Sequence, residues 1–192
     1  RKAGHDVYTP TLTGLGERKH LLTTQTDLST HVTDIVNTLI YEDLQDVILA
    51  GHSYGGMVIT GVADRVPDRI REMVFLDAAH PGDGQSLVDI APATMAFARM
   101  SSKVVNDIEL VMWPDEAMIS AMGVSDPTDL AMLRMKMMPH PWKAFEERLH
   151  FENADAASKI PRTNVNCVAT MSGSTDIDRG RQTAGLRNFE IN

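Results

Sequence analysis

The chain has 192 residues, 43% of them hydrophobic, which indicates one folded domain rather than a disordered chain. Its 26 acidic side chains outnumber its 18 basic ones, and the net charge of -8 argues against a nucleic-acid-binding protein and against docking on an anionic membrane. Cys167 is the single cysteine, so an internal disulfide is excluded.

The first part of the chain alternates between predicted strands and helices. Residues 7–9 are a short β-prone run, and the Thr-, Gly- and Pro-rich residues 9–18 indicate a loop. A helix capped by Ser29 or Thr30 is predicted next, because apolar residues recur at helical spacing on one face: Val32, Ile35, Val36, Leu39 and Ile40.

Two continuous apolar runs predict buried strands. Residues 46–50 and 73–76 lie on either side of a predicted helix, residues 57–66, which Pro67 ends. Strands that are apolar on both faces are typical of a parallel sheet covered by helices. Their alternation with helices therefore predicts an α/β fold.

Residues 85–151 lack the alternating pattern of the preceding part of the chain. They contain no convincing strand and several helical windows. Nine of the twelve methionines fall in this range: Met95, Met100, Met112, Met118, Met122, Met132, Met135, Met137 and Met138. A strand at 164–168, a polar loop, a short helix near 179–184 and a strand at 189–191 are predicted after it. We therefore divide the chain into an α/β core at 1–84, an insertion at 85–152 and a second part of the core at 153–192.

A G-x-S-x-G motif, Gly51-His52-Ser53-Tyr54-Gly55-Gly56, joins a predicted buried strand to a predicted helix. This context favours a nucleophile elbow over a chance match in a Gly-rich turn. A sharp turn would expose the Ser53 hydroxyl and place the Tyr54 backbone N–H as an oxyanion donor. Side chains at Gly51 and Gly55 are expected to collide with the neighbouring turn.

These motifs resemble the α/β-hydrolase superfamily, in particular the branch with esterases and hydroxynitrile lyases. The residues that carry the resemblance are 3–7, 12–18, 47–56, 74–78, 139–141 and 160–163. The resemblance implies a mostly parallel sheet flanked by helices, with residues 85–152 as a helical cap. It also implies a serine nucleophile at Ser53.

Family members begin with a strand that ends in a His-Gly motif and close with a Gly-His-Asp-like turn that carries the catalytic histidine. The chain starts after the first feature and stops at Asn192, where the second is expected. The resemblance therefore implies an incomplete, inactive fragment. The chain shows no signal peptide, so a cytoplasmic location is expected.

The catalytic acid has three candidates. The resemblance places it on the loop after the penultimate strand, which offers Asp176 and Asp178, although neither falls directly after the strand. Asp77 ends the strand that follows the elbow helix, a position where some family members carry the acid. The alternative for Asp77 is a carboxylate that anchors the loop.

The substrate pocket is expected under the cap, where flexible methionines adapt to varied apolar groups, although core filling explains most of them. Trp113 and Trp142 either line the pocket or pack beneath it. His80 follows the strand that ends at Asp77 and is interpreted mainly as a packed loop histidine, with a catalytic base as the alternative.

These features predict a serine hydrolase for small carboxylic esters that forms an acyl-enzyme and needs no cofactor or metal. A small-molecule ester is the expected partner. A cyanohydrin lyase is the first alternative and would need a cap lysine over the site, from Lys103, Lys136 or Lys143. A non-catalytic small-molecule-binding protein with the same fold is the second.

Overall fold

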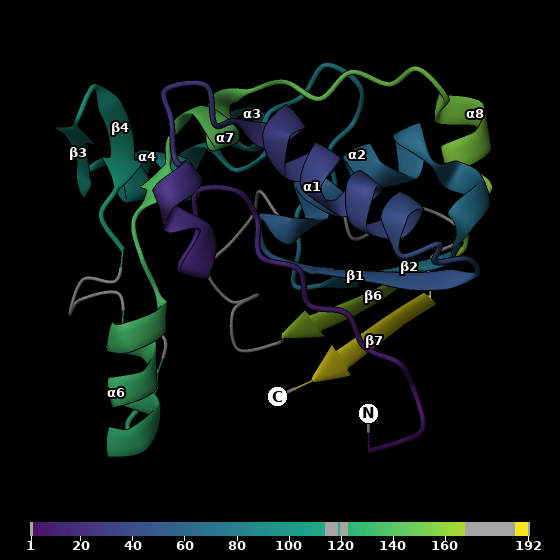
Figure 1. The fold of residues 1–192 in the computed structure, drawn as a ribbon, viewed down its shortest axis with the longest axis horizontal. Coiled ribbons are helices and arrows are strands. Elements are labelled where there is room, and N and C mark those ends of the chain that lie inside the picture. Colours follow the sequence, from purple (N-terminus) through teal and green to yellow (C-terminus); the bar gives the residue numbers. More distant parts are fainter. Residues whose placement is uncertain (1, 114–118, 120–122, 168–186, 192) are drawn as a thin grey trace.

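The computed structural model describes residues 2–113, 119, 123–167 and 187–191 (Figure 1). Two 3-10 helices, labelled η, accompany its α-helices and strands. The elements are, in chain order, η1 (Gly16–Leu21), α1 (Leu28–Tyr41), β1 (Val47–His52), α2 (Gly55–Arg65), η2 (Pro67–Arg69), β2 (Ile70–Leu76), α3 (Leu87–Ile90), α4 (Pro92–Arg99), β3 (Ser102–Val105), β4 (Ile108–Val111), α6 (Pro127–Lys136), β5 (His140–Pro141), α7 (Lys143–Glu146), α8 (Ala154–Ala157), β6 (Arg162–Cys167) and β7 (Arg187–Ile191).

Four strands form a parallel sheet in the order β1-β2-β6-β7, as the α/β pattern predicts. His52 at the end of β1 lies opposite Leu76 at the end of β2, so the segments after these strands leave the sheet side by side. Helices α1 and α2 cover one face of the sheet (Figure 1). In open α/β sheets, ligands bind at the carboxyl ends of the strands, and the segments after β1 and β2 meet at that edge.

The hydrophobic core lies between this sheet and the helices above it. Its largest fully buried apolar side chains include Met57 and Val62 of α2, Met73 and Phe75 of β2, and Phe145 of α7. Close packing of such side chains gives the elements around the sheet edge fixed positions. No helix in the described ranges is both long and apolar enough to cross a membrane.

Helix α1 begins earlier than predicted, because Asp27 is its N-cap rather than Ser29 or Thr30. The Asp27 carboxylate accepts the Thr30 N–H at 2.9 Å, and the Thr30 hydroxyl faces the Asp27 N–H, which completes a capping box. Ser29 instead donates its N–H and its hydroxyl to the Glu147 carboxylate, at 2.8 and 2.7 Å. The predicted cap is therefore wrong, while the helix is confirmed. Val32 and Leu39 of its predicted apolar stripe are buried and Ile35 and Val36 half-buried, but Ile40 is 42% exposed.

The predicted strand at residues 7–9 is absent. Val7 and Tyr8 are 45% and 51% exposed, and within the described residues no strand pairs with them. A short β-prone run has little stability without a partner strand. The expected burial of both sheet faces is also wrong for the described part, since Ile48 of β1 and Leu76 of β2 are 45% and 37% exposed.

The insertion contains strands that the sequence analysis did not predict. Strands β3, β4 and β5 form a small antiparallel sheet beside the helices. Asn106 and Asp107 form the two-residue turn between β3 and β4, with φ of 51° and 63°. Type I′ hairpin turns need positive φ at both positions, and Asn and Asp tolerate it best after glycine. The insertion is therefore not purely helical.

The two ends of the insertion meet. Gln85 and Leu149 form an antiparallel bridge, in which the Leu149 N–H donates to the Gln85 carbonyl at 3.0 Å. The division of the chain at residues 84 and 152 stays a prediction. The bridge shows that the intervening segment leaves the α/β core and returns to it at one place.

Candidate active site

Ser53 occupies the turn between β1 and α2 in a strained backbone conformation. Its φ of 51° lies in the left-handed region, which is uncommon for a residue with a side chain. The Ser53 N–H faces the Leu76 carbonyl at 3.4 Å, and its carbonyl accepts the Ala79 N–H at 3.0 Å. Contacts with the end of β2 thus hold the strained turn, while Ser53 itself is exposed. This geometry is typical of a nucleophile elbow.

The glycines around Ser53 have unequal roles. A Cβ on Gly51 would lie 2.6 Å from the Gly55 carbonyl oxygen, and a Cβ on Gly56 would lie 2.0 Å from the Ala79 carbonyl oxygen. A Cβ on Gly55 would meet nothing within 4 Å outside its own helix and chain neighbours. The prediction was correct for Gly51 and wrong for Gly55. Gly56, the following residue, carries the second steric requirement because it packs on the segment after β2.

Tyr54 is the N-cap residue of α2, with αR backbone angles. An N-cap N–H has no acceptor inside its own helix, and the positive end of the helix dipole lies at the same point. The Tyr54 N–H therefore suits a negatively charged oxygen beside Ser53. Its role as an oxyanion donor stays a prediction. His52, at the end of β1, is exposed, and it does not line the cavity that opens beside Ser53.

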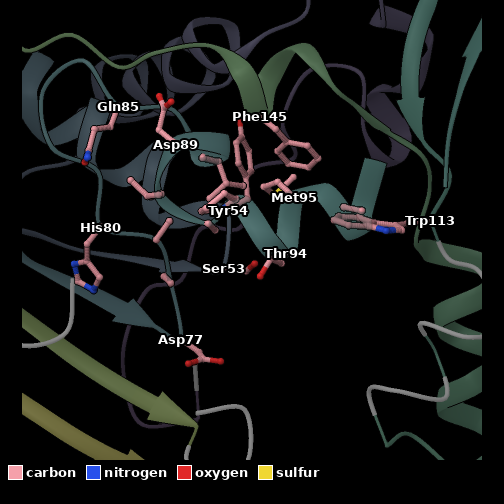
Figure 2. A pocket seen from close by; sticks show the side chains of 17 residues that line it. Ser53, Tyr54, Asp77, His80, Gln85, Asp89, Thr94, Met95, Trp113 and Phe145 are labelled. Carbon is pink, nitrogen blue, oxygen red and sulfur yellow. The ribbon is translucent and has the colours of Figure 1, made fainter. Parts of the chain in front are cut away.

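A cavity of about 500 Å³ opens at this edge of the sheet, and Ser53 lies on its wall (Figure 2). Segments from the α/β core and the insertion line it together. Its apolar part includes Leu87, Ile90, Ala91, Pro92, Met95, Ala98, Trp113 and Phe145, and its polar part includes His80, Gln85, Asp89 and Thr94. The size and the mostly apolar lining fit a small organic molecule.

Two of the polar groups already have partners. The Asp89 carboxylate accepts the Ser86 N–H and hydroxyl at 2.9 and 2.8 Å, and Arg148 at 3.0 Å. Gln85 accepts the Gly82 N–H at 2.7 Å through its amide oxygen. The amide oxygen of Gln85 is therefore engaged within the protein.

Five of the predicted site residues line the cavity: Ser53, Tyr54, Asp77, His80 and Trp113. Trp142 is 2% exposed and packs beneath the cavity. Its indole N–H donates to Glu146 at 2.8 Å, and Arg99 covers its ring at 4.5 Å. Asp176 and Asp178 lie outside the described residues.

His80 has the environment of a packed loop histidine. Its ring stacks on Phe75 with ring centres 4.1 Å apart, and Figure 2 shows it well apart from the Ser53 hydroxyl. Asp77 directly follows β2 with a φ of 43° and lines the same cavity. The catalytic roles of Asp77 and His80 both stay predictions.

The methionines of the insertion do not form a common lining. Met95 is buried and lines the cavity, whereas Met100, Met132 and Met135 are 83%, 50% and 72% exposed. Sequence composition could not distinguish buried from exposed methionines, since the short helices of the insertion have outer faces that meet solvent.

A buried aromatic cluster beneath the cavity was missed by the sequence analysis. His31 is fully buried on α1, and His140 of β5 is 8% exposed. Both rings contact Tyr54, with centres 5.8 and 5.0 Å away, and His140 stacks on Phe145 at 4.3 Å. The available signal was helical spacing, because His31 lies three residues after Leu28 and beside Val32 on the buried face.

Comparison with known families decides the class of this fold. A model of the alpha/beta hydrolase family matches residues 1–176. The chain belongs to this family. The predicted fold class is therefore confirmed.

Two relatives of this alpha/beta hydrolase are named as esterases. It is 54% identical over 95 residues, or 50% of the chain, to a carbendazim hydrolyzing esterase of Nocardioides sp. (strain SG-4G). It is 23% identical over 128 residues, or 59% of the chain, to the putative methylesterase 13, chloroplastic, of Arabidopsis thaliana. The matches span only 39% and 28% of these two relatives.

The chain is also similar to a solved structure of an alpha/beta-hydrolase. An extracellular alpha/beta-hydrolase from a Paenibacillus species, described as sharing structural and functional homology with tobacco salicylic acid binding protein 2, superposes with a TM-score of 0.77 at 26% identity. The superposition covers 100% of the chain and 80% of that structure.

The buried His140 should make this alpha/beta hydrolase less stable in acid. Burial, and to a smaller extent nearby His31, lowers the pKa of His140 from 6.5 to about 3. Below pH 6.5 the unfolded chain therefore binds more protons than the folded chain, and stability falls as the pH drops towards 3, by up to about 1.4 kcal/mol per pH unit. We expect the free energy of unfolding of His140→Phe, measured in urea between pH 6.5 and 4.5, to fall less steeply with decreasing pH than that of the wild type. The exposed His150→Gln serves as control, and an unchanged slope in His140→Phe would contradict this account.

Proposed function

We propose that the protein is a serine hydrolase that cleaves small carboxylic esters through an acyl-enzyme intermediate. One observation carries the proposal: an exposed serine in a positive-φ turn directly after strand β1 lines a largely apolar cavity of about 500 Å³. The esterases among its relatives support the same reaction class. The partner is a small-molecule ester.

The proposed reaction has two steps. Ser53 Oγ attacks the ester carbonyl carbon while a general base takes its proton, and the Tyr54 N–H donates to the oxyanion that forms. The tetrahedral intermediate collapses, the alkoxide leaves with the proton from the base, and the acyl group stays on Ser53. Water then attacks the acyl carbonyl while the same base takes its proton. The bond between the acyl carbon and Ser53 Oγ breaks, the base returns the proton to Oγ, and the carboxylic acid leaves.

The family resemblance assigns the base to a histidine of a Gly-His-Asp-like turn. Asp77 is the candidate for the acid that orients it, with Asp176 and Asp178 as alternatives. We assign the base to none of the described histidines. His80 shares the cavity but packs on Phe75, and His31 and His140 lie in the cluster beneath it.

The lyase alternative has less support. None of the side chains that line the described cavity is a lysine. Lys143 lies 3.5 Å from the Asp27 carboxylate and donates to Gln25, so its ammonium has partners at the start of α1. A catalytic lysine over Ser53 is therefore not favoured by this arrangement.

A fluorophosphonate probe tests the proposal and separates it from the ligand-binding alternative. The protein encoded by the complete reading frame should react with one equivalent of probe, and peptide mass spectrometry should find the adduct on Ser53. Pre-treatment with a small aryl ester should slow the labelling. A folded protein that remains unlabelled, or is labelled at another residue, would refute the serine-hydrolase proposal and favour a non-catalytic binding protein.

A further inference from the structure

The loop at residues 12–18, one of the segments that carries the family resemblance, is tied to helix α1. The Thr13 N–H and hydroxyl donate to the two oxygens of the Asp34 carboxylate, at 2.6 and 2.9 Å. Arg18 lies 2.9 Å from the same carboxylate and donates to the Thr13 hydroxyl at 2.9 Å. Three hydrogen bonds, two to Asp34 and one from Arg18, thus fix the position of Thr13, including its carbonyl.

The Thr13 carbonyl in turn orients His31. It lies 3.0 Å from His31 Nε2, and the Tyr54 hydroxyl lies 2.8 Å from His31 Nδ1. A carbonyl oxygen only accepts, so Nε2 carries the hydrogen, and in a neutral ring Nδ1 then accepts from the Tyr54 hydroxyl. The direction of both hydrogen bonds therefore follows from the single contact with Thr13.

The environment keeps both groups in these protonation states. Burial lowers the pKa of His31, so its ring is neutral at neutral pH. Burial, with smaller contributions from Glu147 and Asp27, raises the pKa of the Tyr54 phenol, which therefore remains a donor. A neutral histidine that accepts from a protonated phenol is the stable pairing here.

Tyr54 needs such an anchor. It starts helix α2 without a side-chain cap, and it immediately follows the strained Ser53. The rings of His31, His140 and Phe145 enclose its ring in edge-on contacts, with centres 5.0–5.8 Å away. This packing restricts the phenol to one position. A residue held at its far end has less freedom to move its backbone N–H.

We propose that Asp34, Thr13 and His31 form a hydrogen-bonded chain that fixes Tyr54 and thereby positions its backbone N–H toward the oxyanion. The proposal rests on the proposed function and gives the 12–18 loop a role in it. His31 is a positioning residue and touches no substrate. Preorganised donors stabilise a transition state because they need not reorient when charge develops.

The chain is tested with Tyr54→Phe, His31→Leu and the double variant in the full-length protein. Tyr54→Phe keeps the ring and the backbone N–H and removes only the hydroxyl. We expect kcat per phosphonate-titrated site to fall about five- to tenfold in each single variant, the effect of one lost hydrogen bond, with KM changed less than about twofold. The double variant should lose no more than the worse single variant, because both interrupt one chain.

Affinity for a transition-state analogue gives a second readout. Binding of a boronic acid should weaken in parallel with kcat, whereas inhibition by the carboxylic acid product should not change. Asp34→Asn, at the far end of the chain, should show a smaller effect of the same kind. Since His31→Leu risks poor folding, Tyr54→Phe is the deciding variant.

Two matched variants control for stability and for the substitution itself. Leu39→Ala in the same helix should lower the melting temperature but leave kcat per titrated site unchanged, and Tyr41→Phe at an 84% exposed position should change neither. Wild-type kcat in Tyr54→Phe, an effect on KM alone, or additive losses in the double variant would overturn the positioning role. Failure of Ser53 to react with the phosphonate would instead overturn the proposed function.

Discussion

Replacing Ser53 by alanine should lower kcat/KM for a small aryl ester by at least about 10³-fold, because the acyl-enzyme route needs the serine oxygen. The residual rate should come from binding and from the oxyanion donors, which the substitution leaves in place. The measurement is the initial rate of p-nitrophenyl acetate hydrolysis by the full-length protein and the variant. Circular dichroism melting should show both to be folded.

Ser158→Ala is the matched control. The Ser158 hydroxyl donates to the Asp155 carbonyl at 2.9 Å, and the residue lies by α8, away from the cavity. Its removal should leave the rate within about twofold, as expected for a surface substitution of small effect. If Ser53→Ala kept a tenth or more of the activity, Ser53 would not be the nucleophile.

Gly56→Ala should destabilise the fold strongly, while Gly55→Ala one residue earlier should not. A Cβ at Gly56 would lie 2.0 Å from the Ala79 carbonyl oxygen, a backbone atom that cannot rotate away, whereas a Cβ at Gly55 has open space. Overpacking of this kind costs about 1–3 kcal/mol or more. Since 1 kcal/mol corresponds to about 2–4 °C at this size, thermal unfolding should show a clear drop for Gly56→Ala only.

The rate at which phosphonate labels Ser53 should also differ between the Gly56→Ala and Gly55→Ala variants. Ala79 donates to the Ser53 carbonyl, so a shift of this segment should disturb the turn and slow the reaction with phosphonate in Gly56→Ala. Gly55→Ala should keep a wild-type unfolding temperature. Equal losses of stability in the two variants would show that the contact with Ala79 does not set the requirement for glycine.

The parallel sheet, the elbow and helix α1 could be predicted because each has a strong local signal. The periodic apolar residues from Val32 to Leu39 and the sequence from Gly51 to Gly56 determine local structure through spacing and sterics. The β3–β4 hairpin was not predicted because the helical patterns around it are a stronger local signal than its two turn residues, Asn106 and Asp107. Residues 7–9 show the reverse error, since strand propensity without a partner strand does not make a strand.

The candidate site was only partly predictable because burial depends on the whole fold. Ser53 and Tyr54 follow from the motif, but the positions of Trp113 and Trp142 relative to the cavity depend on how the insertion folds over the core. The roles of His31 and of the 12–18 loop needed the three-dimensional contacts, since Thr13, His31 and Tyr54 are distant in sequence. The steric role of Gly56 also depends on Ala79, which belongs to another segment.

The bridge between Gln85 and Leu149 has a consequence for how such proteins diversify. The insertion leaves and re-enters the core at one point, yet its His140 and Phe145 pack against the ring of Tyr54, next to Ser53. Its parts therefore differ in how freely their sequence can change. The cavity walls that Met95 and Trp113 contribute can vary with less effect on the turn between β1 and α2, whereas exchange of the whole insertion between relatives would also replace the packing around Tyr54.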